Sequence, residues 1–150
     1  MTERGRFSFG VVLAVLGLVV ADARAAEPRN DEAVAYRRHV MRTMSEQAAA
    51  LALVLQQKAP AENAAVHARV IALGAQTAVK AFEEKVPGGE ARPEIWRRWD
   101  DFSKRLTALS EGANDLASIA EREGLPAMQA RVMNVLGACK ACHDTYTFRR

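Results

Sequence analysis

The sequence predicts an all-α fold, an antiparallel four-helix bundle. Alanine, the strongest helix former, supplies 29 of the 150 residues. Apolar residues recur at alternating steps of three and four, the spacing of one helix face. Segments with proline and glycine divide the chain into four such stretches, and long helices with short links favour antiparallel neighbours. A formal charge of +3 without a basic stripe gives no support for nucleic-acid binding.

The first 25 residues have the layout of a secretory signal peptide. Two arginines precede a largely apolar run over residues 7–20, and Ala23-Arg-Ala25 offers a small-residue cleavage site. At 1.5 Å per residue this run reaches about 21 Å, too short for a hydrocarbon core of about 30 Å. We therefore expect a signal peptide over 1–25, one exported domain over 26–150, and no stable membrane span after cleavage.

The first helix of that domain is expected over 31–58, before Pro60. Asn30 or Asp31 can cap its amino end. Arg37 falls on the inward stripe, where an apolar residue would be expected, and it therefore needs an anion. The apolar members of the stripe are Val34, Met41, Met44, Ala48, Leu51 and Leu55.

The second helix is expected over 61–85, and the proline- and glycine-rich segment 86–93 is expected to be a loop. Residues spread along one side of this helix are Val66, Val70, Leu73, Thr77 and Phe82.

The third helix is expected to begin with Pro93 in its first turn and to end at Gly124, with an interruption near Gly112. Pro126 then begins the fourth helix. Its inner side is expected to carry Met128, Val132, Val135, Leu136, Cys139, Cys142 and Tyr146.

The chemistry of the chain lies in Cys139-Lys-Ala-Cys142-His143, a C-x-x-C-H motif that contains both cysteines. In an exported protein this motif is typical of a covalently attached haem c. Cysteines three residues apart on a helix face the same way, so both can bind the haem vinyl groups, and His143 then ligates the iron. Three other interpretations are a disulfide closing a very small loop, a thioredoxin-like dithiol, and a zinc site that would need His39 or His67.

These residues resemble the class II c-type cytochromes, which include cytochrome c′, itself a standard example of a four-helix bundle. The resemblance implies one covalent haem c with iron, His143 as proximal ligand, and the option of a homodimer. One position departs from the family pattern, since Thr147 stands where many members have a basic residue. The segments that match are 33–38, 58–60, Phe82, 91–96 and 137–144.

The resemblance also implies roles on the distal side of the haem. Five positions after Tyr36, cytochromes c′ have an apolar side chain that does not bind iron, whereas the low-spin branch has a methionine that does. Here that residue is Met41, which implies His/Met ligation, with Met44 as its rival. Arg37 resembles the arginine that pairs with a haem propionate, and Phe82 matches a position that lines the pocket.

We therefore expect a periplasmic monohaem electron carrier, and not an enzyme, with a low-spin haem ligated by His143 and Met41. A His/Met pair leaves no open position on the iron, which favours electron transfer with redox partner proteins over gas binding. The main alternative is a five-coordinate cytochrome c′ that binds nitric oxide or carbon monoxide. The second is a haem-free helical module whose C-x-x-C motif is a thiol switch.

Overall fold

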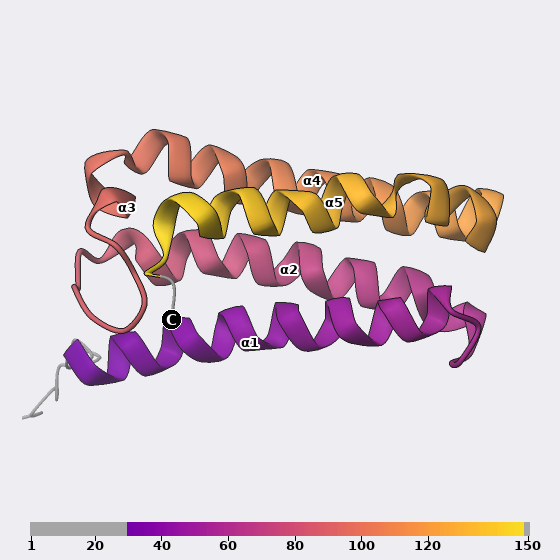
Figure 1. Cartoon of the computed structure of the whole chain (residues 1–150), viewed down its shortest axis with the longest axis horizontal. Helices are drawn as coiled ribbons and strands as arrows, with labels where there is room; N and C mark the ends of the chain where they lie inside the picture. The colour runs from indigo at the N-terminus through magenta and orange to yellow at the C-terminus, as the bar shows by residue number, and fades with distance from the viewer. Residues whose placement is uncertain (1–29, 149–150) are drawn as a thin grey trace, which may run out of the picture.

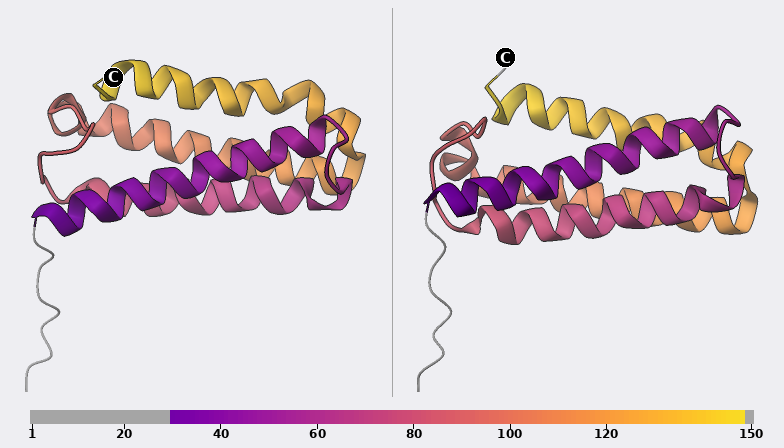
Figure 2. Two further views of the ribbon diagram at one scale, coloured as in Figure 1. Left: turned by 60° about the horizontal axis from the view of Figure 1, so that its bottom comes forward. Right: turned by 90° about the horizontal axis from the view of Figure 1, so that it is seen from below.

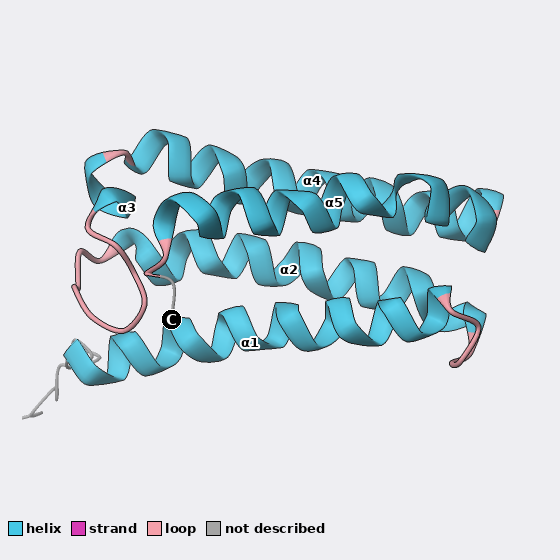
Figure 3. Ribbon diagram, viewed as in Figure 1, coloured by secondary structure: helices cyan, strands magenta, loops and turns pink. Residues whose placement is uncertain are grey.

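The computed structural model describes residues 30–148, and its long helices form the expected antiparallel four-helix bundle (Figures 1 and 3). The predicted signal peptide over 1–25 lies outside the described residues. No helix within 30–148 is long and apolar enough to cross a membrane. The elements in chain order are α1 (Asn30–Leu55), η1 (Ala61–Asn63), α2 (Ala64–Glu83), α3 (Glu94–Arg97), α4 (Trp99–Glu123) and α5 (Leu125–Tyr146).

Helix α1 ends three residues earlier than expected, because Gln57 turns the chain into the left-handed region with φ 59°. The backbone N–H of Lys58 then donates to the Leu53 carbonyl at 2.9 Å, and that of Gln57 donates to the Val54 carbonyl at 2.9 Å. This pair of bonds is a Schellman motif, which satisfies carbonyls that a helix end leaves unpaired. Glycine usually occupies the left-handed position, so a glutamine there could not be expected from the sequence.

The third predicted helix is interrupted at a different place from the one expected. The break lies at Arg98, whose φ of −123° and ψ of 44° separate α3 from α4, while α4 continues through Gly112. Gly124 follows with φ 85°, a conformation that glycine adopts at no steric cost. Pro126 then lies in the first turn of α5, where its missing N–H would have had no helical partner.

Helix α2 packs through alanine and not through its larger side chains. Val66 and Leu73, expected on the same side as Phe82, are 55% and 60% exposed, whereas Phe82 is buried. Small side chains let the backbone of α2 approach α1 and α4 closely, and this contact outweighs the greater hydrophobicity of valine and leucine. The buried face of α2 consists of Ala64, Ala65, Ala68, Ile71, Ala72, Ala75, Ala78 and Phe82.

The bundle widens between α1 and α5. Both views in Figure 2 show these two helices diverging toward the end of the bundle where α1 begins and α5 ends. The segment 84–93 lies at the same end. It is tied to the end of α5, since the Arg92 N–H donates to the Tyr146 carbonyl at 3.0 Å and the Phe148 N–H to the Glu90 carbonyl at 2.9 Å. This end of the bundle holds the candidate site.

Candidate functional site

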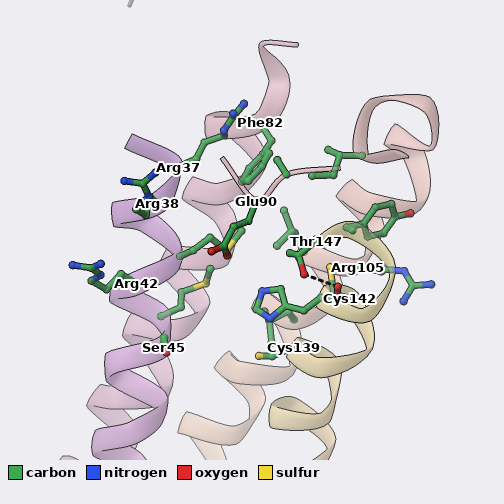
Figure 4. A pocket seen from close by; sticks show the side chains of 18 of the residues that line it. Arg37, Arg38, Arg42, Ser45, Phe82, Glu90, Arg105, Cys139, Cys142 and Thr147 are labelled. Carbon is green, nitrogen blue, oxygen red and sulfur yellow. Dashed lines mark hydrogen bonds between the residues drawn. The ribbon is translucent and has the colours of Figure 1, made fainter. Parts of the chain in front are cut away.

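A cavity of about 940 Å³ lies between α1, α4, α5 and the segment 88–91. Its size is at the upper end of the range of about 300–1,000 Å³ that is usual for cofactor sites. Cys139, Cys142 and His143 of α5 line one wall, and Met41 and Met44 of α1 line the other. Figure 4 shows the two cysteines on α5 facing α1 across this space. The structure thus brings together residues about 100 positions apart that the sequence had selected separately.

Both cysteines are free thiols that lie partly buried in the cavity wall. Burial raises the pKa of each thiol, and at Cys142 the nearby Arg105 guanidinium opposes this shift. A raised pKa keeps a thiol protonated at neutral pH, and the protonated form is the poor nucleophile. The environment is therefore unfavourable for a reactive thiol switch. Within residues 30–148, no group of three or more His, Cys, Asp or Glu side chains offers a metal site of the zinc type.

His143 lies at the edge of the cavity, one turn after Cys139 on the same side of α5. Its side chain is exposed, so this side of the site faces solvent. Its carbonyl accepts hydrogen bonds from the backbone N–H of Thr147 at 3.1 Å and from the Thr147 hydroxyl at 2.8 Å. Thr147 therefore closes the end of α5, in the position where the family pattern has a cation.

A charged cluster that the sequence analysis missed joins α4 to α5 beside Cys142. The Tyr146 hydroxyl and the Arg105 Nε both donate to Oδ2 of Asp101, the latter at 2.8 Å. The hydrogen bond from Tyr146 is the main cause that lowers the pKa of Asp101, and Arg105 adds to it. The sequence signal that could have revealed this cluster is the spacing of Asp101 and Arg105, which are four residues apart. Tyr146 was expected only as an apolar inward residue.

Arg37 is buried, with 3% of its surface exposed, as its place on the inward stripe predicted. Its Nη1 donates to the Val86 carbonyl at 2.7 Å, and its guanidinium lies 4.9 Å from the ring centre of Phe82 and 5.5 Å from that of Trp96. Burial lowers its pKa despite the charge of Glu84. The Val86 carbonyl and the two aromatic rings thus give the guanidinium much of the electrostatic stabilisation that an anion was expected to give.

One guanidinium nitrogen of Arg37, Nη2, is buried and has no hydrogen-bond partner. Such atoms are uncommon in folded proteins, because each costs the desolvation free energy of a polar group. Arg37 also lines the cavity, so a carboxylate bound there could meet this nitrogen. Two thiols, an adjacent imidazole and this donor around one large cavity fit a covalently attached haem with its propionates.

The two methionines differ in their surroundings. Met41 is partly buried and packs against the edge of the core. Met44, one turn later, is 8% exposed and lies against Gly74 of α2. Both line the cavity, as does Phe82, so the three distal residues selected from the sequence lie at the site.

Residues 32–147 match the family model described as Cytochrome C′. The chain belongs to the cytochrome c′ family. It is 31% identical over 118 residues to cytochrome c′ of Alcaligenes xylosoxydans xylosoxydans, covering 77% of this chain and 93% of the relative. It is 33% identical over 123 residues to cytochrome c-556 of Agrobacterium tumefaciens strain II Chrys, covering 76% and 95%.

Solved structures of cytochrome c′ also share the fold. One has a TM-score of 0.73 and 28% identity and covers 81% of this chain and 99% of that chain. Another is the nitric oxide complex of a variant of cytochrome c′ from Alcaligenes xylosoxidans, with a TM-score of 0.74, 27% identity and coverage of 82% and 99%. The predicted family and four-helix bundle are confirmed.

Membership of the cytochrome c′ family establishes a haem-binding protein with one covalently attached haem c and its iron. The prediction of a low-spin electron carrier with His/Met ligation is wrong. The matching family model and the solved structures are those of cytochrome c′, which supports the five-coordinate alternative instead. The error came from reading a methionine five positions after Tyr36 as a ligand, when an apolar side chain at that place satisfies the cytochrome c′ pattern equally well.

Proposed function

We propose that this chain is a periplasmic cytochrome c′ whose five-coordinate haem binds nitric oxide or carbon monoxide on its distal side. The observation that carries the proposal is the cavity between the C-x-x-C-H motif and α1, where Met41, Met44 and Ala48 supply apolar side chains beside several charged ones. A related cytochrome c′ variant has been solved as a nitric oxide complex, which favours this ligand class. When bound, the haem supplies an iron with an open coordination position.

The residues of α5 hold the cofactor in this proposal. Cys139, Cys142 and His143 line the cavity, and the two cysteines would form the thioether bonds while His143 would ligate the iron. All three lie within two turns of α5, so this one helix would hold the haem. Side chains of α1 line another wall of the cavity, and they would limit the room available to a ligand.

Met41 is a wall residue and not a ligand in this proposal. A methionine side chain is flexible and apolar and often fills irregular gaps in helical cores. Met41 lies at the cavity edge with part of its surface still exposed, so it limits the distal space without closing it. Phe82 completes the apolar lining near the Arg37 end.

Arg37 is proposed as a partner of a haem propionate through its free Nη2. The fork of a guanidinium lets one nitrogen stay on the Val86 carbonyl while another meets a carboxylate. The aromatic rings of Phe82 and Trp96 hold the fork in place, and the Trp96 Nε1 in turn donates to the Phe82 carbonyl at 2.9 Å.

The optical spectrum of the purified holoprotein tests the proposed function. We expect a high-spin ferric spectrum without the methionine-to-iron charge-transfer band, and a shifted Soret band when the dithionite-reduced protein meets carbon monoxide. A low-spin ferric spectrum with that band, and no response to carbon monoxide, would contradict the proposal. Absence of a Soret band would exclude haem altogether. The Cys139→Ala/Cys142→Ala chain is the control that cannot hold haem covalently.

Location and partners complete the proposal. We expect removal of residues 1–25 on export and recovery of the mature chain in the periplasmic fraction, which mass spectrometry of that fraction would check. Gas binding to the ferrous form requires an electron, so a redox partner protein is expected. A homodimer is expected from the resemblance, and sedimentation equilibrium of the holoprotein would measure it.

A further inference from the structure

A glycine in the middle of α2 lies directly beneath Met44. A Cβ atom added at Gly74 would lie 2.4 Å from Met44 Cγ and 3.1 Å from Met44 Sδ. Separations below 3.0 Å are not tolerated between carbon atoms, so the methionine occupies space that any other residue at position 74 would fill. Glycine weakens a helix interior relative to alanine, which makes its presence in this alanine-rich helix informative.

The side chain of Met44 has two places that it can occupy. In this structure it lies over Gly74, buried among the core residues of α1 and α2. Its other border is the haem cavity, which it lines together with Met41. The surrounding core is close-packed, so the cavity is the open volume toward which a displaced thioether would turn.

We propose that Gly74 is a specificity-determining residue that keeps Met44 out of the distal space. It forms a socket on α2 for the Met44 thioether, and this leaves room beside the haem for a diatomic ligand. The inference rests on the proposed function and adds to it a residue that, together with Met41, sets the size of the distal space. Gly74 acts through Met44 and does not itself touch the ligand.

The geometry determines what a small substitution would do. Alanine at position 74 places its Cβ against Met44 Cγ, an atom near the base of the side chain, so χ1 of Met44 has to change. Three rotatable bonds allow Met44 to move more easily than two packed helix backbones can. The Sδ atom then turns toward the cavity and narrows the distal space.

The test measures carbon monoxide association with the ferrous holoprotein by flash photolysis. For Gly74→Ala we expect association about tenfold slower, as overpacking of a filled site predicts. The double variant Gly74→Ala/Met44→Ala should recover the rate of Met44→Ala alone. Leu73→Ala is the matched control, since Leu73 is exposed on the same helix and its variant should keep the original rate.

The outcomes separate this inference from the proposed function. A five-coordinate holoprotein whose carbon monoxide rate is unchanged by Gly74→Ala would overturn the socket and leave the proposed function standing. A double variant as slow as Gly74→Ala would also overturn it, because the effect would not pass through Met44. An unsubstituted holoprotein that is low-spin and does not bind carbon monoxide would overturn the proposed function itself.

A second measurement does not depend on the folding of any variant. In the unsubstituted ferric holoprotein, with ¹³C-labelled methionine methyl groups, the Met41 methyl signal should be broadened more strongly by the iron than that of Met44. This difference is expected because the socket holds Met44 against α2. Equal broadening of the two signals would overturn the proposal.

Discussion

Replacing Arg37 with methionine should destabilise the protein, and the structure indicates by how much. The change removes the hydrogen bond from Nη1 to the Val86 carbonyl, worth about 1.5–3 kcal/mol for a charged donor. It also removes two cation–π contacts, to Phe82 and Trp96, worth about 1 kcal/mol each. Methionine regains part of this, because an apolar side chain has no cost of burying a charge. We expect a net loss of about 2 kcal/mol in the free energy of unfolding.

Urea denaturation followed by circular dichroism measures this loss, and Arg38→Met is the matched control. Arg38 is the next residue and lies exposed on α1, so its substitution removes the same charge without a buried contact. We expect it to change stability by less than about 0.5 kcal/mol. Equal losses for the two variants would refute the reasoning from burial.

The Arg37→Met variant also tests the propionate contact. If Nη2 of Arg37 meets a propionate, Arg37→Met should cost about 1–2 kcal/mol more in the holoprotein than in the haem-free chain made with Cys139→Ser and Cys142→Ser. Arg131→Met is the control here, because Arg131 is exposed on α5 and does not line the cavity, and it should show no such difference. An identical cost with and without haem would exclude the propionate contact while leaving the stacking on Phe82 and Trp96 intact.

Three further predictions follow from the site. Met41→Ala should leave the ferric spectrum high-spin and speed carbon monoxide association, because it enlarges the distal space; a change from low-spin to high-spin would show that Met41 had been a ligand. Tyr146→Phe should destabilise the protein at neutral pH, because the Tyr146 hydroxyl lowers the pKa of Asp101. That contribution is present above the ordinary aspartate pKa of about 3.9 and is lost as pH falls through the lowered one, so the gap between the two urea midpoints should close below about pH 4. The haem-free chain should unfold at a markedly lower temperature than the holoprotein by circular dichroism, because the cavity of about 940 Å³ then loses its apolar filling.

The helices themselves could be predicted from local sequence. Pro93 and Pro126 mark helix starts and Gly124 marks an end, because proline lacks the N–H that a first turn leaves unpaired and glycine adopts positive φ. The break at Arg98 could not be predicted in this way. Neither proline nor glycine stands at this position, so nothing in the local sequence marks the change of backbone conformation there.

The buried face of α2 shows where hydrophobic periodicity misleads. Val66 and Leu73 are more hydrophobic than the alanines around them, yet they are exposed. The face that is buried is set by how closely the partner helices approach, and α1 and α4 approach the alanine side. Single-sequence periodicity ranks side chains by hydrophobicity and carries no information about that distance.

The sequence by itself determined the cofactor chemistry and the helix order, because both depend on residues near one another along the chain. The spacing of Cys139, Cys142 and His143 is a local property of one helix turn. Only the tertiary structure decided what faces that motif. The α1 wall with its two methionines, the stacked Arg37, the cluster around Asp101 and the socket at Gly74 all face or join residues of other helices. Distances across a bundle follow from the packing of whole helices. That packing depends on many small contacts acting together, and no short stretch of sequence specifies it.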